Sequence, residues 1–448
     1  MEKLKSYITG LQNHQGFKKY FRNTSWLFFE KILRLLVGFL VGIWVIRYLG
    51  PNDYGLLSYV QSFVSLFAVV ATIGLDQIVI RELIKNPENR DVLLGSAFGL
   101  KVVGVVFMFL FLGIGIFISD NDFYTNFLIF IIASASVFQT LNVIDFYFQS
   151  KVLSKFVVYA NLISLAFSSF FKIVFILTEM PLLAFIFLIV FDSFVLALGL
   201  LYVYQRQGLS IFEWSFDLTK SKALIIDSFP IILGSIAVTI YMKIDQVMIK
   251  EMLGSKAVGQ YAAAIRLSEL WYFIPMSVVG SLFPAIIKAK QLNKQLLSTR
   301  LKALYSLMIW VAIAIAIPTT FLSEWLINLL FSGEFHESGS VLKIHIWSGI
   351  FVFLGVASGN WIISENLQKY STINTFLGAL LNVLLNIFLI NSMGIVGAAW
   401  ASLFSYFFSG YLAFAFWKKT RTNFYYLTTG FLPKEFFKAI KHLKHKNI

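Results

Sequence analysis

Long apolar runs recur along almost the whole of this 448-residue chain, and they restrict its fold more than any other feature. A helix needs roughly 20 apolar residues to cross a bilayer core of about 30 Å. Windows of that length predict about twelve spans, and glycine and proline within them are compatible with membrane helices. Runs such as Phe107–Phe111 lack the alternation of a membrane β-barrel. The predicted spans are 25–47, 54–75, 92–118, 123–147, 156–178, 181–204, 223–247, 257–287, 302–330, 341–363, 370–391 and 394–417.

The balance of charge indicates how these spans are oriented. Only 13% of residues are charged, against about 25% in soluble domains, which excludes a soluble enzyme. The 37 Lys and Arg outnumber the 23 Asp and Glu, and roughly three quarters of them fall in alternate connections. The opposite loops carry acids such as Asp120, Glu179 and Glu334. The positive-inside rule therefore predicts a multi-pass protein with both termini in the cytoplasm, and the basic excess does not indicate nucleic-acid binding.

A polar connection in mid-chain predicts two lobes of six helices. The turn that follows the first helix of each half has a similar sequence, Leu49 to Gly55 and Leu253 to Gly259. Parallel repeats of this kind place a substrate site between two lobes. The predicted regions are a cytoplasmic N-terminal arm (1–22), an N-terminal lobe (23–204), a cytoplasmic linker (205–222), a C-terminal lobe (223–417) and a basic amphipathic cytoplasmic tail (418–448).

The tail pattern favours a short helix on the surface of the membrane. Phe436, Ile440 and Leu443 recur at helical spacing, while lysines occupy the other face. Such helices lie on anionic leaflets. The alternative is a frayed basic tail.

Several charged residues fall inside the predicted spans. Lys243, Asp245 and Lys343 are expected near the outer interface, and Asp145 and Asp227 near the inner one, where side chains can snorkel. A charge at mid-bilayer costs about 2.5–3.5 kcal/mol on insertion scales, so deeper charges need an interior role. The deeper set is Glu30, Lys31, Arg34, Lys101, Asp192, Arg266 and Glu269.

Helix geometry groups the deeper charges into a cationic site. Glu30 and Arg34 are four residues apart and Arg266 and Glu269 three apart, so each pair shares a helix face. If the two halves face each other, both pairs can line one central cavity; the alternative is that they are self-neutralised pairs that serve packing. Lys31 and Lys101 have no obvious acid one helical turn away to pair with, which makes the interior cationic and suited to a diphosphate.

Other chemistry has no support in the sequence. The chain contains no Gly-x-x-x-x-Gly-Lys-Ser/Thr phosphate loop, and its five histidines are scattered, so neither a nucleotide nor a metal or other cofactor is expected. Its predicted outer loops are too short for a catalytic domain. We therefore expect that the protein is not an enzyme.

Three segments carry a resemblance to a known family. They are the run from Arg47 to Gly55 with Ile73-Gly74-Leu75 and Arg81-Glu82; Ile244-Asp245-Gln246-Val247-Met248-Ile249 with Leu253-Gly254, Val258-Gly259-Gln260-Tyr261 and Ala264; and Gly394-Ile395-Val396-Gly397-Ala398-Ala399-Trp400-Ala401. In this order and spacing, the chain resembles the polysaccharide flippases called Wzx or RfbX. These belong to the multidrug/oligosaccharidyl-lipid/polysaccharide exporter superfamily.

The resemblance implies a fold and a function. The fold is all-α, with about twelve transmembrane helices in two six-helix lobes around a central cavity. The function is inversion of undecaprenyl-diphosphate-linked oligosaccharide across the bacterial inner membrane, for O-antigen or other surface polysaccharide. Arg34 and Arg266 match the arginines that hold the diphosphate in related flippases.

The remaining interior charges have assisting roles in this hypothesis. Lys31 and Lys101 would strengthen the positive field, and Glu30, Glu269 and Asp192 would modulate charge or couple transport to H⁺ or Na⁺. Association with other polysaccharide assembly proteins is a further expectation. The alternatives are a cation-coupled multidrug exporter, a peptidoglycan-precursor flippase, a membrane-embedded polymerase and a scaffold; twelve spans disfavour the precursor flippases, which typically have fourteen.

Overall fold

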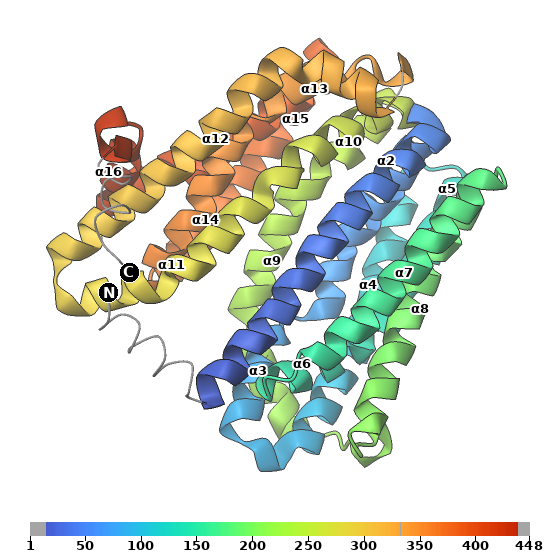
Figure 1. The fold of residues 1–448 in the computed structure, drawn as a ribbon. Coiled ribbons are helices and arrows are strands. Elements are labelled where there is room, and N and C mark those ends of the chain that lie inside the picture. Colours follow the sequence, from blue (N-terminus) through green and yellow to red (C-terminus); the bar gives the residue numbers. More distant parts are fainter. Residues whose placement is uncertain (1–14, 332, 438–448) are drawn as a thin grey trace. The chain divides into compact units, whose positions relative to one another are not determined.

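Helices account for all the regular structure in the part of the chain that is described. The computed structural model describes residues 15–331 and 333–437 (Figure 1). The predicted arm (1–22) lies largely outside these residues, as does the tail helix from Lys438 on. Large apolar side chains such as Phe117 (91% exposed), Phe123 (87%) and Phe321 (84%) lie on the surface. Such a surface is stable in hydrocarbon rather than in water, and the prediction of an all-α multi-pass membrane protein is confirmed.

Glycine breaks relate the long helices to the predicted spans. Among the described residues, nine helices are long and apolar enough to cross a membrane, and the bent pair Ser338–His345 and Ser348–Ser364 makes a tenth. The helices that contain Gly50 and Gly394 each hold two span-length segments, because the backbone at these glycines is not helical. Counting those segments separately gives twelve in the described chain, as predicted.

The described chain forms two compact units, which we call the N-terminal unit (residues 15–48 and 63–236) and the C-terminal unit (49–62 and 237–437). The N-terminal unit contains most of α2 (Gln15–Thr72), the first part of α9 (Leu218–Leu253), and α3 (Asp76–Lys85), η1 (Pro87–Asn89), α4 (Arg90–Ile118), α5 (Phe123–Phe138), η2 (Gln139–Asn142), α6 (Val143–Ser150), α7 (Lys155–Leu177), α8 (Leu182–Arg206) and η3 (Ile211–Glu213). Its core includes the buried Leu83, Leu94 and Tyr204.

The C-terminal unit has a core of its own around Tyr305, Met308 and Phe353. It contains the remaining parts of α2 and α9, together with α10 (Ser255–Glu269), η4 (Leu270–Tyr272), α11 (Phe273–Leu292), α12 (Lys294–Phe331), η5 (Gly333–Phe335), α13 (Ser338–His345), α14 (Ser348–Ser364), α15 (Gln368–Gly410), η6 (Leu412–Ala415) and α16 (Arg421–Gly430). The division into lobes at 205–222 stays a prediction.

The repeated turn has one backbone conformation at both places. Gly50 has φ 66° and ψ 176°, and Gly254 has φ 87° and ψ 175°, a region that residues with a Cβ avoid. Within the C-terminal unit the helices after these turns pack closely. A Cβ on Gly55 would collide with the Ser255 carbonyl oxygen, and one on Gly259 would collide with the Pro51 carbonyl. Gly50 and Gly254 are therefore needed for the turns, and Gly55 and Gly259 for the close packing of the helices that follow.

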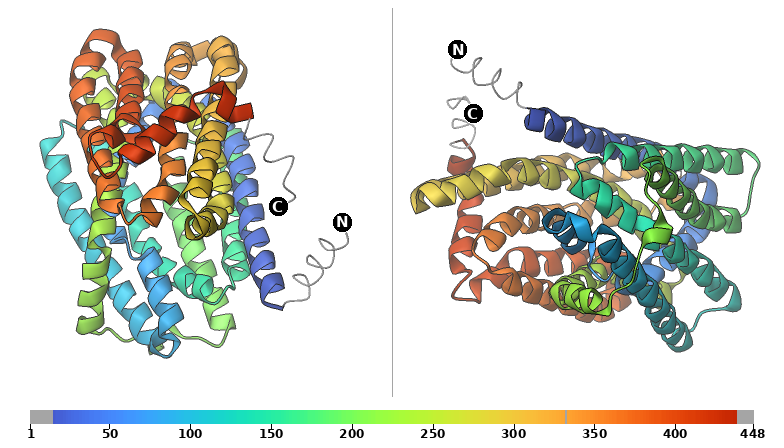
Figure 2. Two further views of the ribbon diagram at one scale, coloured as in Figure 1. Left: turned by 90° about the vertical axis from the view of Figure 1, so that its left-hand side faces the viewer. Right: turned by 90° about the horizontal axis from the view of Figure 1, so that it is seen from below.

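The segment after the last predicted span packs on the C-terminal unit. Helix α16 lies across α12 in Figure 2, and the buried Asn423 accepts a hydrogen bond from the Tyr305 hydroxyl at 2.7 Å. Leu427 is also fully buried. Residues 433–437 begin a further helix, so the amphipathic tail helix stays a prediction beyond them.

Candidate functional site

The first charged group lies on α2 in the N-terminal unit. Arg34 Nε donates a hydrogen bond to Glu30 Oε1 at 2.7 Å, as their four-residue spacing predicts. The Glu30 side chain is 7% exposed, whereas that of Arg34 is 45% exposed and Lys31 is also exposed. Glu30 is therefore covered by the helix bundle, while Arg34 and Lys31 are exposed at its surface.

The second charged group lies in a polar cavity of about 260 Å³ within the N-terminal unit. Lys101 is 6% exposed, and its Nζ lies 3.4 Å from the Gln139 carbonyl oxygen and 5.2 Å from the centre of the Phe146 ring. The sequence offers Lys101 no neighbouring acid, but the structure supplies Asp76 from α3 and Asp145 from α6. The other polar side chains that line the cavity are Thr72, Ser136, Gln139, Thr140, Asn142 and Asn161.

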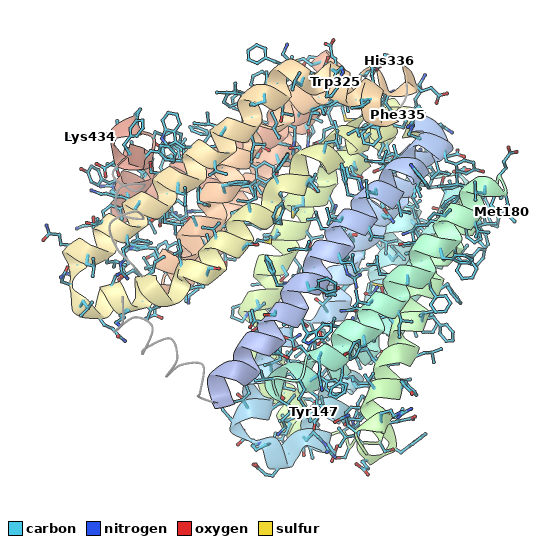
Figure 3. All side chains as sticks on the ribbon, viewed as in Figure 1. Tyr147, Met180, Trp325, Phe335, His336 and Lys434 are labelled. Atoms are coloured by element: carbon cyan, nitrogen blue, oxygen red, sulfur yellow. The ribbon has the colours of Figure 1, made fainter. Side chains whose placement is uncertain are left out.

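A break in the helix makes this cavity possible. The predicted span 123–147 contains the 3₁₀ turn η2, Gln139–Asn142, between α5 and α6. The carbonyl of Gln139, the first residue of this turn, accepts from Lys101. Asp145 lies two residues before Tyr147, which Figure 3 shows at the opposite end of the unit from Met180. The cavity therefore lies toward the end of the unit that carries α6.

The third charged group lies on α9 and α10 in the C-terminal unit. Arg266 is exposed, although its neighbours from Val258 to Ser268 are otherwise buried. Glu269 interacts electrostatically with Lys243 and with Arg266. As predicted, Arg266 and Glu269 come together, and the structure adds Lys243, which the sequence places at the outer interface. Asp245 also acts on Glu269, so two cations and two acids meet in this group.

Asp245 corrects an expectation from the sequence. Instead of snorkelling out of the helix bundle, its side chain is buried, and the residue is 5% exposed. Its carboxylate accepts hydrogen bonds from the Tyr261 hydroxyl (2.6 Å), from Asn386 Nδ2 (2.6 Å) and from the Ser402 hydroxyl. These donors lie on α10 and on both segments of α15. Asp145 is likewise turned inward, and accepts from Gln149 Nε2 at 2.9 Å.

Asp192 and two asparagines make further polar contacts inside the two units. Asp192 on α8 accepts a hydrogen bond from the Ser164 hydroxyl of α7, so it ties two helices of the N-terminal unit together. Asn382 and Asn386 contact each other at 3.1 Å and were missed at the sequence level. The signal for them is two amides one helical turn apart in an apolar span.

The chain can now be compared with known proteins. The sequence profile of the family described as "Polysaccharide biosynthesis protein" matches residues 20–290, more than half of the chain. The chain belongs to this polysaccharide biosynthesis protein family. The profile of the MatE family also matches residues 230–388.

Relatives and a solved structure agree with this family. The chain is 20% identical to the capsular polysaccharide biosynthesis protein CapF of Staphylococcus aureus, over 89% of this chain and 99% of CapF. It is 27% identical to the probable low-salt glycan biosynthesis flippase Agl15 of Haloferax volcanii, but this match covers 39% of the chain and 37% of Agl15. The lipid II flippase MurJ, in an inward closed conformation, has a similar fold, with a TM-score of 0.69 at 14% identity over 96% of this chain and 94% of MurJ. The resemblance to polysaccharide flippases of this superfamily is confirmed.

Proposed function

We propose that the protein is a flippase for lipid-linked oligosaccharides that serve the synthesis of a surface polysaccharide. Its substrate would be an undecaprenyl-diphosphate-linked repeat unit, such as an O-antigen unit. Alternating access would carry the sugar across the bacterial inner membrane, with both termini of the protein in the cytoplasm and other polysaccharide assembly proteins nearby. The family match and the CapF and Agl15 relatives support this choice.

The observation that carries the proposal is the exposed guanidinium of Arg34 in an apolar helix. Arg34 is nine residues into its predicted span, about 14 Å at 1.5 Å per residue. Hydrocarbon cannot solvate a charge at that depth, so this face of α2 has to meet water or an anionic ligand. A guanidinium matches the geometry of phosphate oxygens, which makes a diphosphate the ligand we favour.

Arg266 is the proposed counterpart in the C-terminal unit. It is the exposed residue in a buried stretch of α10, in a group with Lys243, Glu269 and Asp245. We assign the diphosphate to Arg34 and Arg266, with Lys31 and Lys101 adding positive field. Glu30, Glu269 and Asp192 would modulate this charge or couple transport to a gradient of H⁺ or Na⁺.

Substitutions at Arg34 test the proposal. The purified protein is placed in proteoliposomes with a fluorescent undecaprenyl-diphosphate oligosaccharide, and its transfer between leaflets is followed with a membrane-impermeant quencher. Arg34→Ala should lower the rate about 10- to 100-fold, the loss expected for a charged hydrogen bond. Arg34→Lys should retain part of the rate, because it keeps the charge but not the bidentate geometry.

Two further variants separate binding from packing. Arg34→Ala leaves Glu30 buried without its partner, so the double variant Glu30→Gln, Arg34→Gln removes the pair without stranding a charge. If this double variant transports at the wild-type rate, the pair serves packing and the proposal fails. Arg47→Ala, an exposed arginine near the end of the same helix segment, is the matched control and should transport normally.

A second candidate function follows from the MatE match over residues 230–388. A cation-coupled drug exporter would confer resistance to cationic drugs when overproduced. In that case, deletion of the gene would leave surface polysaccharide and its lipid-linked precursors unchanged. The exposed guanidinium of Arg34 favours anionic cargo instead.

A further inference from the structure

An aromatic groove lies in the C-terminal unit, away from the charged groups described above. Its volume is about 720 Å³, within the range of small-molecule sites. Trp347 and Phe351 of α13–α14 form one wall, and Trp400, Phe404 and Phe407 of α15 form the other. The Phe351 and Phe407 rings are 5.1 Å apart and the Trp400 and Phe404 rings stack at 5.5 Å. Both walls are therefore apolar, and they meet where the Phe351 and Phe407 rings contact each other.

A cation marks one end of the groove. Lys343 lines it, is exposed, and lies one helical turn before Trp347. No acid within ion-pair distance of Lys343 is found in the part of the chain that the structure describes. Phe335 and His336, labelled in Figure 3, lie at the end of the unit where α13 begins. Lys343 and Phe351 are eight residues apart across the bend between α13 and α14, so the groove is at most about 12 Å long between them at 1.5 Å per residue.

The polar inventory of the groove limits what can occupy it. The Trp347 indole Nε1 donates to the Thr320 hydroxyl at 3.0 Å, and that hydroxyl donates to the Ala316 carbonyl oxygen. Among the described lining side chains, this leaves the Lys343 ammonium and the Trp400 indole as hydrogen-bond donors. An occupant should thus be anionic at the Lys343 end and apolar along the rest of its length.

We propose that the groove binds the polyprenyl chain of the lipid-linked substrate, with the phosphate closest to that chain beside Lys343 before or after the diphosphate is held at Arg34 and Arg266. The inference rests on the proposed function, because it assigns a site to the lipid part of the same substrate. A polyprenyl phosphate is pure hydrocarbon up to its phosphate, so no polar atom would be buried against the rings. A bilayer phospholipid would instead bring ester carbonyls into the groove, where burial without donors is costly.

Photolabelling in vesicles tests the groove directly. The full-length protein in phosphatidylcholine vesicles is irradiated with a polyprenyl phosphate that carries a diazirine on its chain and no sugar. Mass spectrometry should map the label to residues 343–351 and 400–407. The double variant Trp400→Ala, Phe404→Ala should lower this labelling about tenfold, because two large apolar contacts are lost.

Matched variants keep the test interpretable. Lys343→Gln leaves the walls intact and should lower labelling about fivefold, the loss of one cation–phosphate interaction. Phe388→Ala, which removes a 71% exposed ring elsewhere on α15, should leave labelling unchanged. If Lys343→Gln and the double variant label like the wild type, the proposal is overturned.

Two comparisons identify the occupant and separate this inference from the proposed function. Phosphatidylglycerol with the same diazirine should label these residues weakly; equal labelling would make the groove a general lipid site and overturn the proposal. If the double variant loses labelling but moves lipid-linked oligosaccharide at the normal rate, the groove is not a substrate site. If the wild-type groove is labelled but the protein moves no oligosaccharide, the proposed function fails and polyprenyl-phosphate binding stands.

Discussion

Each unit holds an aspartate within a membrane helix, and the two side chains have different surroundings. Asp245 in the C-terminal unit is 5% exposed and accepts hydrogen bonds from Tyr261, Asn386 and Ser402. Asp145 in the N-terminal unit lines a cavity of about 260 Å³ and accepts one from Gln149. A carboxylate inside the protein can thus find its hydrogen-bond partners in two ways. Fixed donors can hold it and tie helices together, as at Asp245, or it can share a polar cavity with a cation, as at Asp145. We expect the first arrangement to serve stability and the second to serve transport.

The largest expected effect is on stability, at Asp245. Asp245→Ala leaves three buried donors without their acceptor, which should lower the free energy of unfolding by about 3 kcal/mol. Chemical denaturation of the detergent-purified protein, followed by tryptophan fluorescence, measures the change. Asp120→Ala, an exposed acid outside the network, is the control. A loss below about 1 kcal/mol would contradict this role, because Asp245 would then not hold the helices together.

The next effect concerns transport, at Lys101. Lys101→Met should lower the transport rate about tenfold by removing the cation from the cavity of Asp76 and Asp145. Stability should change less than the transport rate, because Asp76 and Asp145 stay in a polar cavity that offers them other partners. The double variant Lys101→Met, Asp145→Asn should recover part of the rate by restoring the charge balance. Equal losses of stability and rate would instead give Lys101 a structural role.

A smaller effect is expected when one donor is removed from Asp245. Ser402→Ala deletes the bond to Asp245 and the longer contact with the Tyr261 hydroxyl (3.2 Å), but it leaves the bonds from Tyr261 and Asn386 to Asp245 in place, so it should cost about 1 kcal/mol of unfolding free energy. Ser392→Ala, an exposed serine on α15 that bonds its own helix, should be close to neutral. A cost at Ser402 as large as that of Asp245→Ala would show that a single contact carries the network.

The smallest effect is expected at Asp145. Asp145→Asn keeps the shape of the side chain in a cavity that offers other polar partners, so unfolding should change by less than about 0.5 kcal/mol. Asp245→Asn turns an amide N–H toward fixed donors and should cost about 2 kcal/mol. The same denaturation experiment measures both variants. Equal costs for the two exchanges would remove the distinction between network and cavity.

The sequence predicted the helices well and the surroundings of their charges less well. Hydropathy located the spans, and the turn repeated at Gly50 and Gly254 has the same conformation in both places. The same reasoning expected Asp145 and Asp245 to snorkel toward the membrane interfaces. Asp145 instead lines a cavity and Asp245 is buried, because hydropathy measures depth along a helix and not the direction in which a side chain points.

The candidate site divides in the same way. The contact between Arg34 and Glu30 follows from their spacing, because residues four apart share a helix face. The acids beside Lys101 were not predictable, since Asp76 and Asp145 come from other helices. The break at η2, where the Gln139 carbonyl contacts Lys101, was hidden within one apolar run. The functional roles of these charges stay proposals for the experiments above.

The sequence by itself determined that this chain is an all-helical membrane protein, because only helices satisfy the backbone of such long apolar runs in hydrocarbon. It also determined the glycine turns and the polysaccharide family. Only the tertiary structure decided which charged and polar side chains of different helices meet. Asp245 finds partners 16, 141 and 157 residues away, and the groove joins α13 and α14 to α15. Contacts of this kind depend on how helices rotate and pack against one another, which a pattern along one chain does not specify.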